Sequence, residues 1–301
     1  MNGILNLLKP SGMTSHDCVG LLRRITGQKR IGHTGTLDPN ACGVLPLCFG
    51  QSTRLIEYME DEEKIYRCEA LIGLVTDTQD IWGEIKTDNR TNAAKITAED
   101  VRQALMNFCG TILQTPPKFS ALKLNGKRLY QYAREGIGVE IQPREVSVYD
   151  VQFIHYDAQK QRAMFDIRCS KGTYVRTICH DLGALLGVGA CMSFLLRTRT
   201  SGFDICQSYT FEQLLSAGRN EIESMLHPPA DAVKTMPRLE LDADAALLFL
   251  NGNPSFAQKI AHPELTATAA GDRYAVFGTG RLLGVASAEA GRGYRILKVL
   301  H

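Results

Sequence analysis

One loop near the start of the sequence places an acid and a histidine where the backbone is tightly restricted. It runs Gly32-His33-Thr34-Gly35-Thr36-Leu37-Asp38-Pro39. Its glycines permit close approach of the backbone to a ligand, and the proline fixes the chain beside Asp38. A carboxylate held stiffly in this way can act as a nucleophile or accept a proton. Taken alone, the pattern favours a simpler interpretation, with Asp38 in an Asx turn and His33 an ordinary hydrogen-bonded loop residue.

Other segments that could carry chemistry are weak candidates. Neither G-x-G-x-x-G nor G-x-x-x-x-G-K-[ST] occurs, so nothing indicates a nucleotide cofactor. The nine cysteines form no C-x-x-C pair, which argues against zinc and favours reduced, mostly buried thiols. Asp77 and Asp80 could bind a metal, but two acids in a turn are more often solvated or capping groups. Residues 120–123 match S-x-x-K of penicillin-binding enzymes without the companion motifs S-D-N and K-T-G.

The elements that must position the loop alternate irregularly between strand and helix. Residues 29–46 show no clear periodicity and are expected to form a loop. The clearest helix start is the capping box Thr97-Ala98-Glu99-Asp100. The mixture predicts the α+β class and not a regular βαβ alternation. Periodicity and caps predict strands over 2–8, 64–74, 145–157, 161–169 and 190–197, and helices over 15–25, 51–59, 97–108 and 173–186.

The length of 301 residues and the proline-containing segment 228–237 predict two domains. Because a domain averages about 150 residues, we expect a large first domain, 1–230, and a small second one, 238–301. A helix at 243–250 and three strands within 272–299 indicate that the second is mostly β. Hydrophobic residues make up 44% and charged residues 22% of the chain, which excludes disordered and collagen-like classes.

Nothing in the sequence points to a membrane or to export. No stretch without a charged residue exceeds fifteen positions, whereas a spanning helix needs about 20 mostly apolar residues. Residues 1–8 have no basic region and too short an apolar run for a secretory signal. We therefore expect a cytoplasmic protein.

The net charge of +2 hides an uneven distribution of charge along the chain. Residues 9–54 carry six Lys or Arg against two acids, and residues 118–144 again carry six against two. Residues 55–117, which lie between them, carry six against twelve. Two basic blocks beside an acidic one suit a groove for a polyanion, although an uneven charge is more often only a solvated face.

Several separated segments resemble, in order, the motifs of the bacterial tRNA pseudouridine synthases of the TruB type. The resemblance covers roughly residues 2–210. Gln79 departs from it, because small residues are common there, and the C-terminal part resembles only a PUA-type RNA-binding domain. The matching segments are Lys9-Pro10-Ser11-Gly12-Met13-Thr14-Ser15, the loop 32–39 with Gly43-Val44-Leu45-Pro46, Tyr66 with Gly73 and Thr76-Asp77-Thr78-Gln79-Asp80, Pro116 to Lys123 with Tyr130, Ser170 to Arg176, and Leu195-Leu196-Arg197-Thr198-Arg199.

The resemblance implies an isomerase that turns uridine 55 in the T-loop of tRNA into pseudouridine. In this family the N1–C1′ bond breaks, the base rotates while held, and a C5–C1′ bond forms, so no redox cofactor or ATP is needed. Asp38 would be the essential aspartate, which either attacks C1′ or removes a ribose proton. Arg176 would keep it ionised, and Tyr66 would stack on the uracil, with a hydroxyl that could help to remove the C5 proton. The ordinary alternatives are a surface arginine and a core tyrosine.

Further residues are expected to bind the RNA. The resemblance implies a large mixed-sheet catalytic domain with helices, in which residues 118–144 form an insertion that grips the T-loop. His33 would fill the space that the flipped base leaves, or be merely structural. Leu196 would pack against that base, although a core leucine is nearly as ordinary, and Lys9 would either support the site or contact RNA. Phosphate contacts are expected from Lys118, Lys123, Lys127 and Arg128.

Two other functions fit parts of this pattern. The basic blocks alone would suit an RNA-binding folding helper with secondary or lost catalysis, but the presence together of Asp38, Tyr66 and Arg176 argues against loss. A guide-RNA-dependent archaeal or eukaryotic relative would typically carry Lys-rich extensions, which this sequence lacks. We therefore expect a monomer that binds the T-arm of tRNA, with no metal, cofactor or obligatory protein partner.

Overall fold

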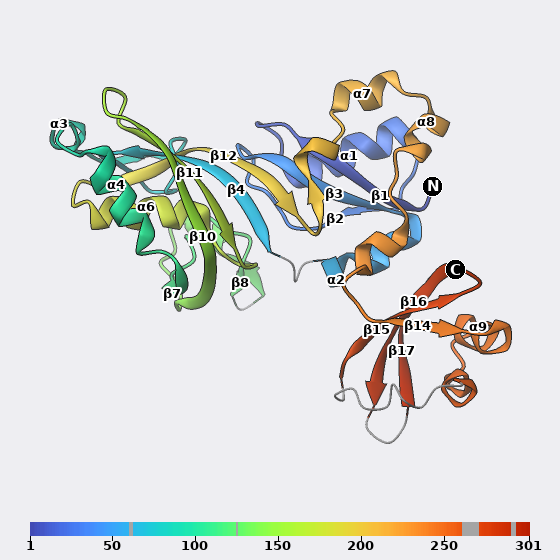
Figure 1. The fold of residues 1–301 in the computed structure, drawn as a ribbon. Helices are drawn as coiled ribbons and strands as arrows, with labels where there is room; N and C mark the ends of the chain where they lie inside the picture. Colours follow the sequence, from blue (N-terminus) through green and yellow to red (C-terminus); the bar gives the residue numbers. More distant parts are fainter. Residues whose placement is uncertain (60–62, 125, 261–270, 290–292) are drawn as a thin grey trace.

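The computed structural model describes residues 1–59, 63–124, 126–260, 271–289 and 293–301 (Figure 1). Within them, a nine-stranded sheet forms the larger part of the molecule, in the order β1-β3-β12-β4-β11-β10-β7, with β2 paired to β3 and β13 to β12. Neighbours are antiparallel except β12 and β3, which run parallel. The strands are β1 (Gly3–Lys9), β2 (Ile31–His33), β3 (Cys42–Phe49), β4 (Lys64–Ile72), β7 (Gly110–Gln114), β10 (Arg144–Asp157), β11 (Arg162–Cys169), β12 (Ala190–Thr200) and β13 (Phe203–Asp204).

Two helices, α4 (Ala98–Met106) and α6 (Val175–Leu185), cover one face of the sheet at the end that holds β11 and β10 (Figure 1). One hydrophobic core joins both helices to the strands beneath them. Along β11 buried and half-buried residues alternate, as expected where only one face of a sheet is covered. The prediction of an α+β fold with a large mixed sheet is confirmed.

Helix α1 (Ser15–Thr26) packs against the other end of the sheet. Its cap is Thr14, which forms a capping box with Asp17, and not Ser15, the residue that the sequence favoured as the cap. The helix ends where Gly27 adopts a left-handed backbone (φ 67°). Helices α7 (Phe211–Ser216) and α8 (Arg219–Ser224) contribute to the same core.

Three predicted elements differ from the structure. Residues 29–46, expected to form a loop, contain β2 and the first part of β3. The strand β3 is almost wholly buried, so its sequence lacks the alternation that marks a half-exposed strand. The helix expected over 51–59 is a 3₁₀ turn, η1 (Gly50–Leu55), followed by the single turn α2 (Ile56–Met59). The strand expected over 64–74 breaks at Gly73 (φ 92°), after which β5 (Leu74–Thr76) pairs with β6 (Ile85–Asp88).

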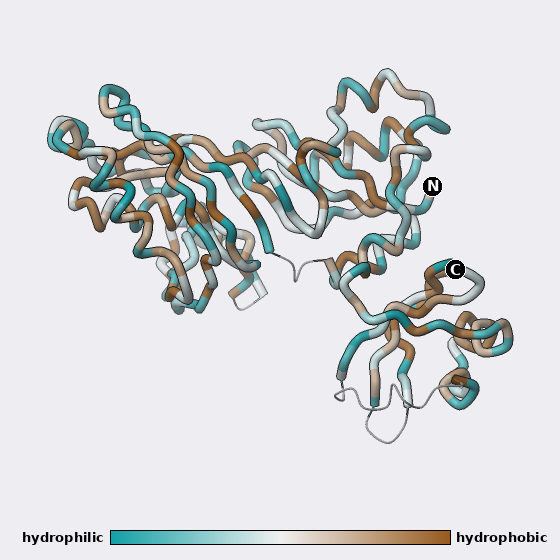
Figure 2. Tube along the Cα trace, viewed as in Figure 1, coloured by the Kyte–Doolittle hydropathy of each residue, from teal (hydrophilic) through white to brown (hydrophobic). Residues whose placement is uncertain are grey.

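A second sheet, in the order β14-β15-β16-β17, lies beyond residue 237 with its own hydrophobic core. It contains β14 (Arg238–Leu241), β15 (Arg273–Gly278), β16 (Arg281–Glu289) and β17 (Gly293–Val299), with α9 (Ala243–Leu250) and η4 (Pro254–Lys259) beside them. The predicted helix and three strands are confirmed, whereas the short strand β14 was not expected. Apolar stretches follow the strands of both sheets (Figure 2). Of the described helices, none is both long and apolar enough to cross a membrane.

The two sheets meet through a shared hydrophobic cluster and an ion pair. The Nζ atom of Lys298 on β17 lies 2.9 Å from a carboxylate oxygen of Glu57 on α2. The cluster includes Ile4, Val44 and Cys48 from β1 and β3, and Ala275, Phe277 and Val285 from β15 and β16. Three other short elements are α3 (Arg90–Ala93), η2 (Ile205–Gln207) and η3 (Pro229–Val233).

Candidate active site

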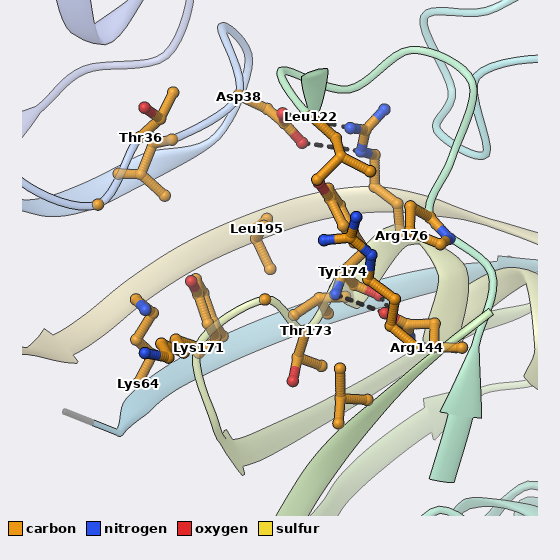
Figure 3. Close-up of a pocket in the computed structure, with 18 of the residues that line it drawn as sticks. Thr36, Asp38, Lys64, Leu122, Arg144, Lys171, Thr173, Tyr174, Arg176 and Leu195 are labelled. Atoms are coloured by element: carbon orange, nitrogen blue, oxygen red, sulfur yellow. Dashed lines mark hydrogen bonds and ion pairs between the residues drawn. The ribbon is translucent and has the colours of Figure 1, made fainter. Parts of the chain in front are cut away.

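A pocket of about 560 Å³ opens between the loop that follows β2 and the start of α6. Its wall comes from residues 35–38, the beginning of β4, the end of β7, the beginning of β10 and residues 171–176 (Figure 3). Asp38, Tyr66 and Arg176 all line it. The structure thus brings the three residues expected to carry catalysis into one cavity, although Asp38 and Arg176 are 138 positions apart.

Asp38 and Arg176 form an ion pair at the edge of this pocket. The Nε atom of Arg176 lies 2.8 Å from Oδ2 of Asp38, and its Nη2 donates to Oδ1 at 3.3 Å. The arginine side chain is 5% exposed and the aspartate 38%. Burial raises the pKa of the Asp38 carboxyl above its ordinary value, and the guanidinium opposes that rise. The arginine partner therefore favours the ionised form of Asp38.

The same guanidinium ties three segments of the chain together. Besides Asp38, it donates to the carbonyl of Thr78 at 3.1 Å and to that of Phe119 at 3.1 Å. Its Nη1 atom also lies 3.7 Å from Oδ2 of Asp80, and this second acid raises the pKa of Asp38 further. Asp80 therefore faces an arginine. Among the described residues, no group of three or more His, Cys, Asp or Glu is arranged to hold a metal ion.

Lys9 fixes the far side of residues 34–41, the loop that carries Asp38 and is the candidate catalytic loop. Its ammonium group donates to the carbonyls of Pro10, Pro39 and Ala41 at 2.8, 3.0 and 2.7 Å. The residue is fully buried, and desolvation lowers its pKa. Three donors on three carbonyls use the whole bonding capacity of a lysine. Of the two roles expected for Lys9, this position fits support of the loop and leaves no atom to contact RNA.

Tyr66 stands on β4 directly opposite Arg197 on β12. The Arg197 side chain is fully buried, and it donates to the carbonyls of Val44 at 2.8 Å and Gly35 at 2.7 Å. It therefore holds the start of the catalytic loop from below. Burial raises the pKa of the Tyr66 phenol, and the positive charge of Arg197 opposes the rise.

Leu196, expected to pack against the base, and His33, expected to fill the space that the base leaves, are not among the residues that line the pocket. Leu195 lines the pocket, and Leu196 is not among its lining residues, because neighbours on a strand point to opposite faces. His33 ends β2 outside the set that lines the pocket. Its Nδ1 atom is buried and has no hydrogen-bond partner among the described residues, and burial lowers its pKa.

The basic segment 118–144 folds as a hairpin followed by a short helix. Strands β8 (Lys123–Leu124) and β9 (Lys127–Arg128) pair, and α5 (Leu129–Arg134) follows them. Leu129 is 1% exposed and anchors the segment. Leu122 and Pro116, at its base, line the pocket beside the ion pair (Figure 3 labels Leu122). The basic segment therefore forms one side of the cavity.

The four cations expected to bind phosphate differ in their surroundings. Lys118, Lys123 and Arg128 are exposed. Lys127 is half-buried, forms an ion pair with Glu135 and lies 4.9 Å from the centre of the Tyr132 ring. Three further cations line the pocket wall: Lys64 and Lys171 lie close together, and Arg144 lies on the side of Tyr174 and Arg176 (Figure 3). This charge suits a phosphate-bearing ligand.

Two residues that shape the site were not singled out in the sequence. Arg197 directly follows the apolar residues 194–196 of β12, and burying a charged residue there is costly unless it is hydrogen-bonded, so that contrast was an available signal. Gln114 ends β7, and its buried amide binds both backbone groups of Tyr174, just before α6. No pattern in the sequence marks that contact, because it joins residues 60 positions apart.

Comparison with known proteins gives consistent matches. A model of the "TruB family pseudouridylate synthase (N terminal domain)" matches residues 23–175, and one of the "tRNA pseudouridylate synthase B C-terminal domain" matches 176–234. A tRNA pseudouridine synthase B of Symbiobacterium thermophilum is 48% identical over 253 residues, which is 84% of this chain and 82% of that protein. A protein of the same name from Clostridium tetani is 36% identical over 300 residues and covers both chains completely.

Two solved structures of complexes contain a chain with the same fold. A chain of a Cbf5-Nop10-Gar1 complex superposes with a TM-score of 0.75 at 25% identity and covers 99% of this chain and 85% of that one. A chain of an H/ACA RNP bound to a substrate RNA containing 2′-deoxyuridine gives a TM-score of 0.74 at 22% identity, with the same coverage. The second likeness concerns the fold alone.

Proposed function

The chain belongs to the TruB family of tRNA pseudouridine synthases, and from its pocket we propose that it isomerises uridine 55 in the T-loop of tRNA without a cofactor. The ion pair of Asp38 and Arg176, in a pocket that also holds Tyr66, is the observation that carries this proposal. The reaction only rearranges atoms: the N1–C1′ bond breaks, the free base turns, and a C5–C1′ bond forms. The proton on C5 is lost to solvent, and N1 takes up a proton. It requires an ionised carboxylate, a cation beside it and a surface that holds the base.

Asp38 supplies the carboxylate. Attack on C1′ and removal of a ribose proton both need its ionised form, which burial disfavours. Arg176 compensates because its guanidinium bonds both carboxylate oxygens. The bonds from Arg176 to Thr78 and Phe119 orient the cation before any substrate enters, so little reorganisation is needed during the reaction.

Tyr66 and Leu195 supply the surface for the base. Both line the pocket, and an aromatic ring with an aliphatic neighbour suits stacking on uracil. The raised pKa keeps the Tyr66 phenol protonated at neutral pH. We therefore assign Tyr66 stacking and hydrogen-bond donation in preference to removal of the C5 proton.

Uridine 55 has to leave the stacked T-loop before it can enter the pocket, which requires base flipping. We propose that the exposed cations of the basic segment contact the phosphates around the flipped nucleotide, and that His33 fills the gap left behind. In this proposal residues 1–230 form the catalytic domain and residues 238–301 a PUA-like RNA-binding domain. The chain acts as a monomer, which light scattering with and without RNA will test.

Tritium release tests the activity and its position. A T-arm stem-loop labelled at C5 of uridine 55 should release tritium with the wild-type chain, and the same RNA labelled only at uridine 54 should not. Asp38→Asn should release none while still binding the stem-loop. Asp150→Asn, which makes the same change at an exposed position on β10, serves as the matched control and should react like wild type.

The outcomes separate the enzyme from a folding helper. Binding without tritium release by the wild-type chain would favour the helper and refute the proposed activity. Release of tritium from RNA labelled at uridine 54 would refute uridine 55 as the only target. Full release by Asp38→Asn would remove Asp38 from its assigned role.

A further inference from the structure

Helix α6, which carries Arg176, begins without a capping side chain of its own. Its N-cap residue is Tyr174, whose side chain makes no capping hydrogen bond. Helices α1, α4 and α7 instead begin at threonines that bond the backbone N–H three residues on. An N-terminus without such a cap leaves the helix start poorly defined, unless another part of the chain supplies the missing bonds.

Gln114, the last residue of β7, supplies bonds at this point. Its Oε1 atom accepts a hydrogen bond from the Tyr174 N–H at 2.8 Å, and its Nε2 atom donates to the Tyr174 carbonyl at 3.1 Å. The residue is 2% exposed. Two bonds from one planar amide fix both the position and the orientation of the Tyr174 peptide groups. The start of α6 is therefore set from a strand 60 residues earlier in the chain.

The segment that follows Gln114 holds the other end of the same arginine. The Phe119 carbonyl, five residues on, accepts a hydrogen bond from Nη2 of Arg176 at 3.1 Å. Gln114 thus fixes the position of the backbone just before Arg176, and the Phe119 carbonyl helps to fix the position of the Arg176 guanidinium group. Gln114 lies four residues before the basic segment 118–144, and Phe119 is its second residue.

We propose that Gln114 is a positioning residue for the isomerisation, which acts by holding the first turn of α6 so that Arg176 meets Asp38. This inference rests on the proposed function. A shift of about 1 Å at a reacting group costs up to about 100-fold in rate, so loss of both bonds should lower the rate of the chemical step roughly 10- to 100-fold. RNA binding should change little, because Gln114 lines the pocket with both of its amide atoms already hydrogen-bonded to Tyr174.

Gln114→Met tests the proposal, because it keeps the length of the side chain and removes both bonds. Gln152→Met on β10 is the matched control, since Gln152 is exposed. We expect a 10- to 100-fold lower single-turnover rate at saturating stem-loop RNA, with the Kd within twofold of wild type. The acid limb of the pH–rate profile should also move to higher pH. The groups that act on Asp38 are Arg176, Asp80 and Lys9, and only the arginine is displaced by this change.

Gln114→Asn provides a second variant in case Gln114→Met does not fold. It keeps the amide but is one methylene too short to reach both Tyr174 groups, so the same two effects are expected. A wild-type rate in either folded variant would overturn the proposal. So would a lower rate with an unmoved acid limb, which indicates general loss of structure. If the wild-type chain itself forms no pseudouridine, the proposed function is refuted. If only the Gln114 variants behave like wild type, the positioning role of Gln114 is refuted and the proposed function stands.

Discussion

Gly43 on β3 lies directly opposite Arg197 on β12, and a Cβ atom at position 43 would stand 2.2 Å from the Arg197 carbonyl oxygen. The backbone at Gly43 has a φ of 114°, which side chains rarely tolerate. This close approach places the Arg197 side chain under the catalytic loop, where it holds the Gly35 carbonyl. A glycine at position 43 is therefore required for the geometry of the site.

Gly43→Ala should destabilise the protein. A strained backbone costs about 1–3 kcal/mol, and the clash with Arg197 adds to it, so the midpoint of thermal unfolding should fall. Gly20→Ala in α1 is the control, because open space surrounds that position and its backbone is unstrained. It should gain about 0.5–1 kcal/mol from helix propensity. Equal midpoints of thermal unfolding for the two variants would contradict the close contact between Gly43 on β3 and Arg197 on β12.

Asp80→Asn should shift the pH dependence of the reaction. The negative charge of Asp80 raises the pKa of Asp38, so its removal should move the acid limb of the pH–rate profile to lower pH. The maximal rate should fall as well, because Arg176 loses one of its partners. Asp77→Asn, in the same turn, should leave the limb in place. If the acid limb of the pH–rate profile moves to higher pH in Asp80→Asn, the charge of Asp80 does not raise the pKa of Asp38, and the prediction is wrong.

Lys9→Met separates the two roles considered for this residue. Loss of charged hydrogen bonds to the loop should cost about 1.5–3 kcal/mol and lower the rate. The dependence of the RNA Kd on salt should remain as in wild type, because the ammonium faces carbonyls and not solvent. A smaller salt slope would instead assign Lys9 to phosphate contact.

Cations of the basic segment should contribute unequally to RNA binding. Lys123→Ala should reduce the slope of log Kd against log salt by about one, since its exposed ammonium can neutralise a phosphate. Lys127→Ala should change the slope less, because its partner Glu135 competes with phosphate. Lys95→Ala, between α3 and α4, is the control. Equal slopes for all three variants would exclude phosphate contacts from this segment.

Local signals in the sequence predicted the helices and strands well, but they predicted the contacts between those elements poorly. The capping box at Thr97 correctly marked the start of α4, because its partners are three residues apart. The strand β3 was missed because its burial on both faces removes the alternation that marks a strand. That Leu195 and not Leu196 lines the pocket depends on the register of β12, which has irregular pairing on both sides of them. The pairing of Asp38 with Arg176 was accessible only through the family resemblance.

The distance in sequence between Asp38 and Arg176 has a consequence during synthesis. A ribosome that adds about 5–20 residues per second needs roughly 7–28 s for the 138 residues between them. During that interval β3, already paired with β1, lacks β12, its other neighbour in the finished sheet. The emerging chain thus contains the first basic block, residues 9–54 with Asp38, before Arg176 has been synthesised. Any product terminated before Arg197 lacks the support beneath its catalytic loop.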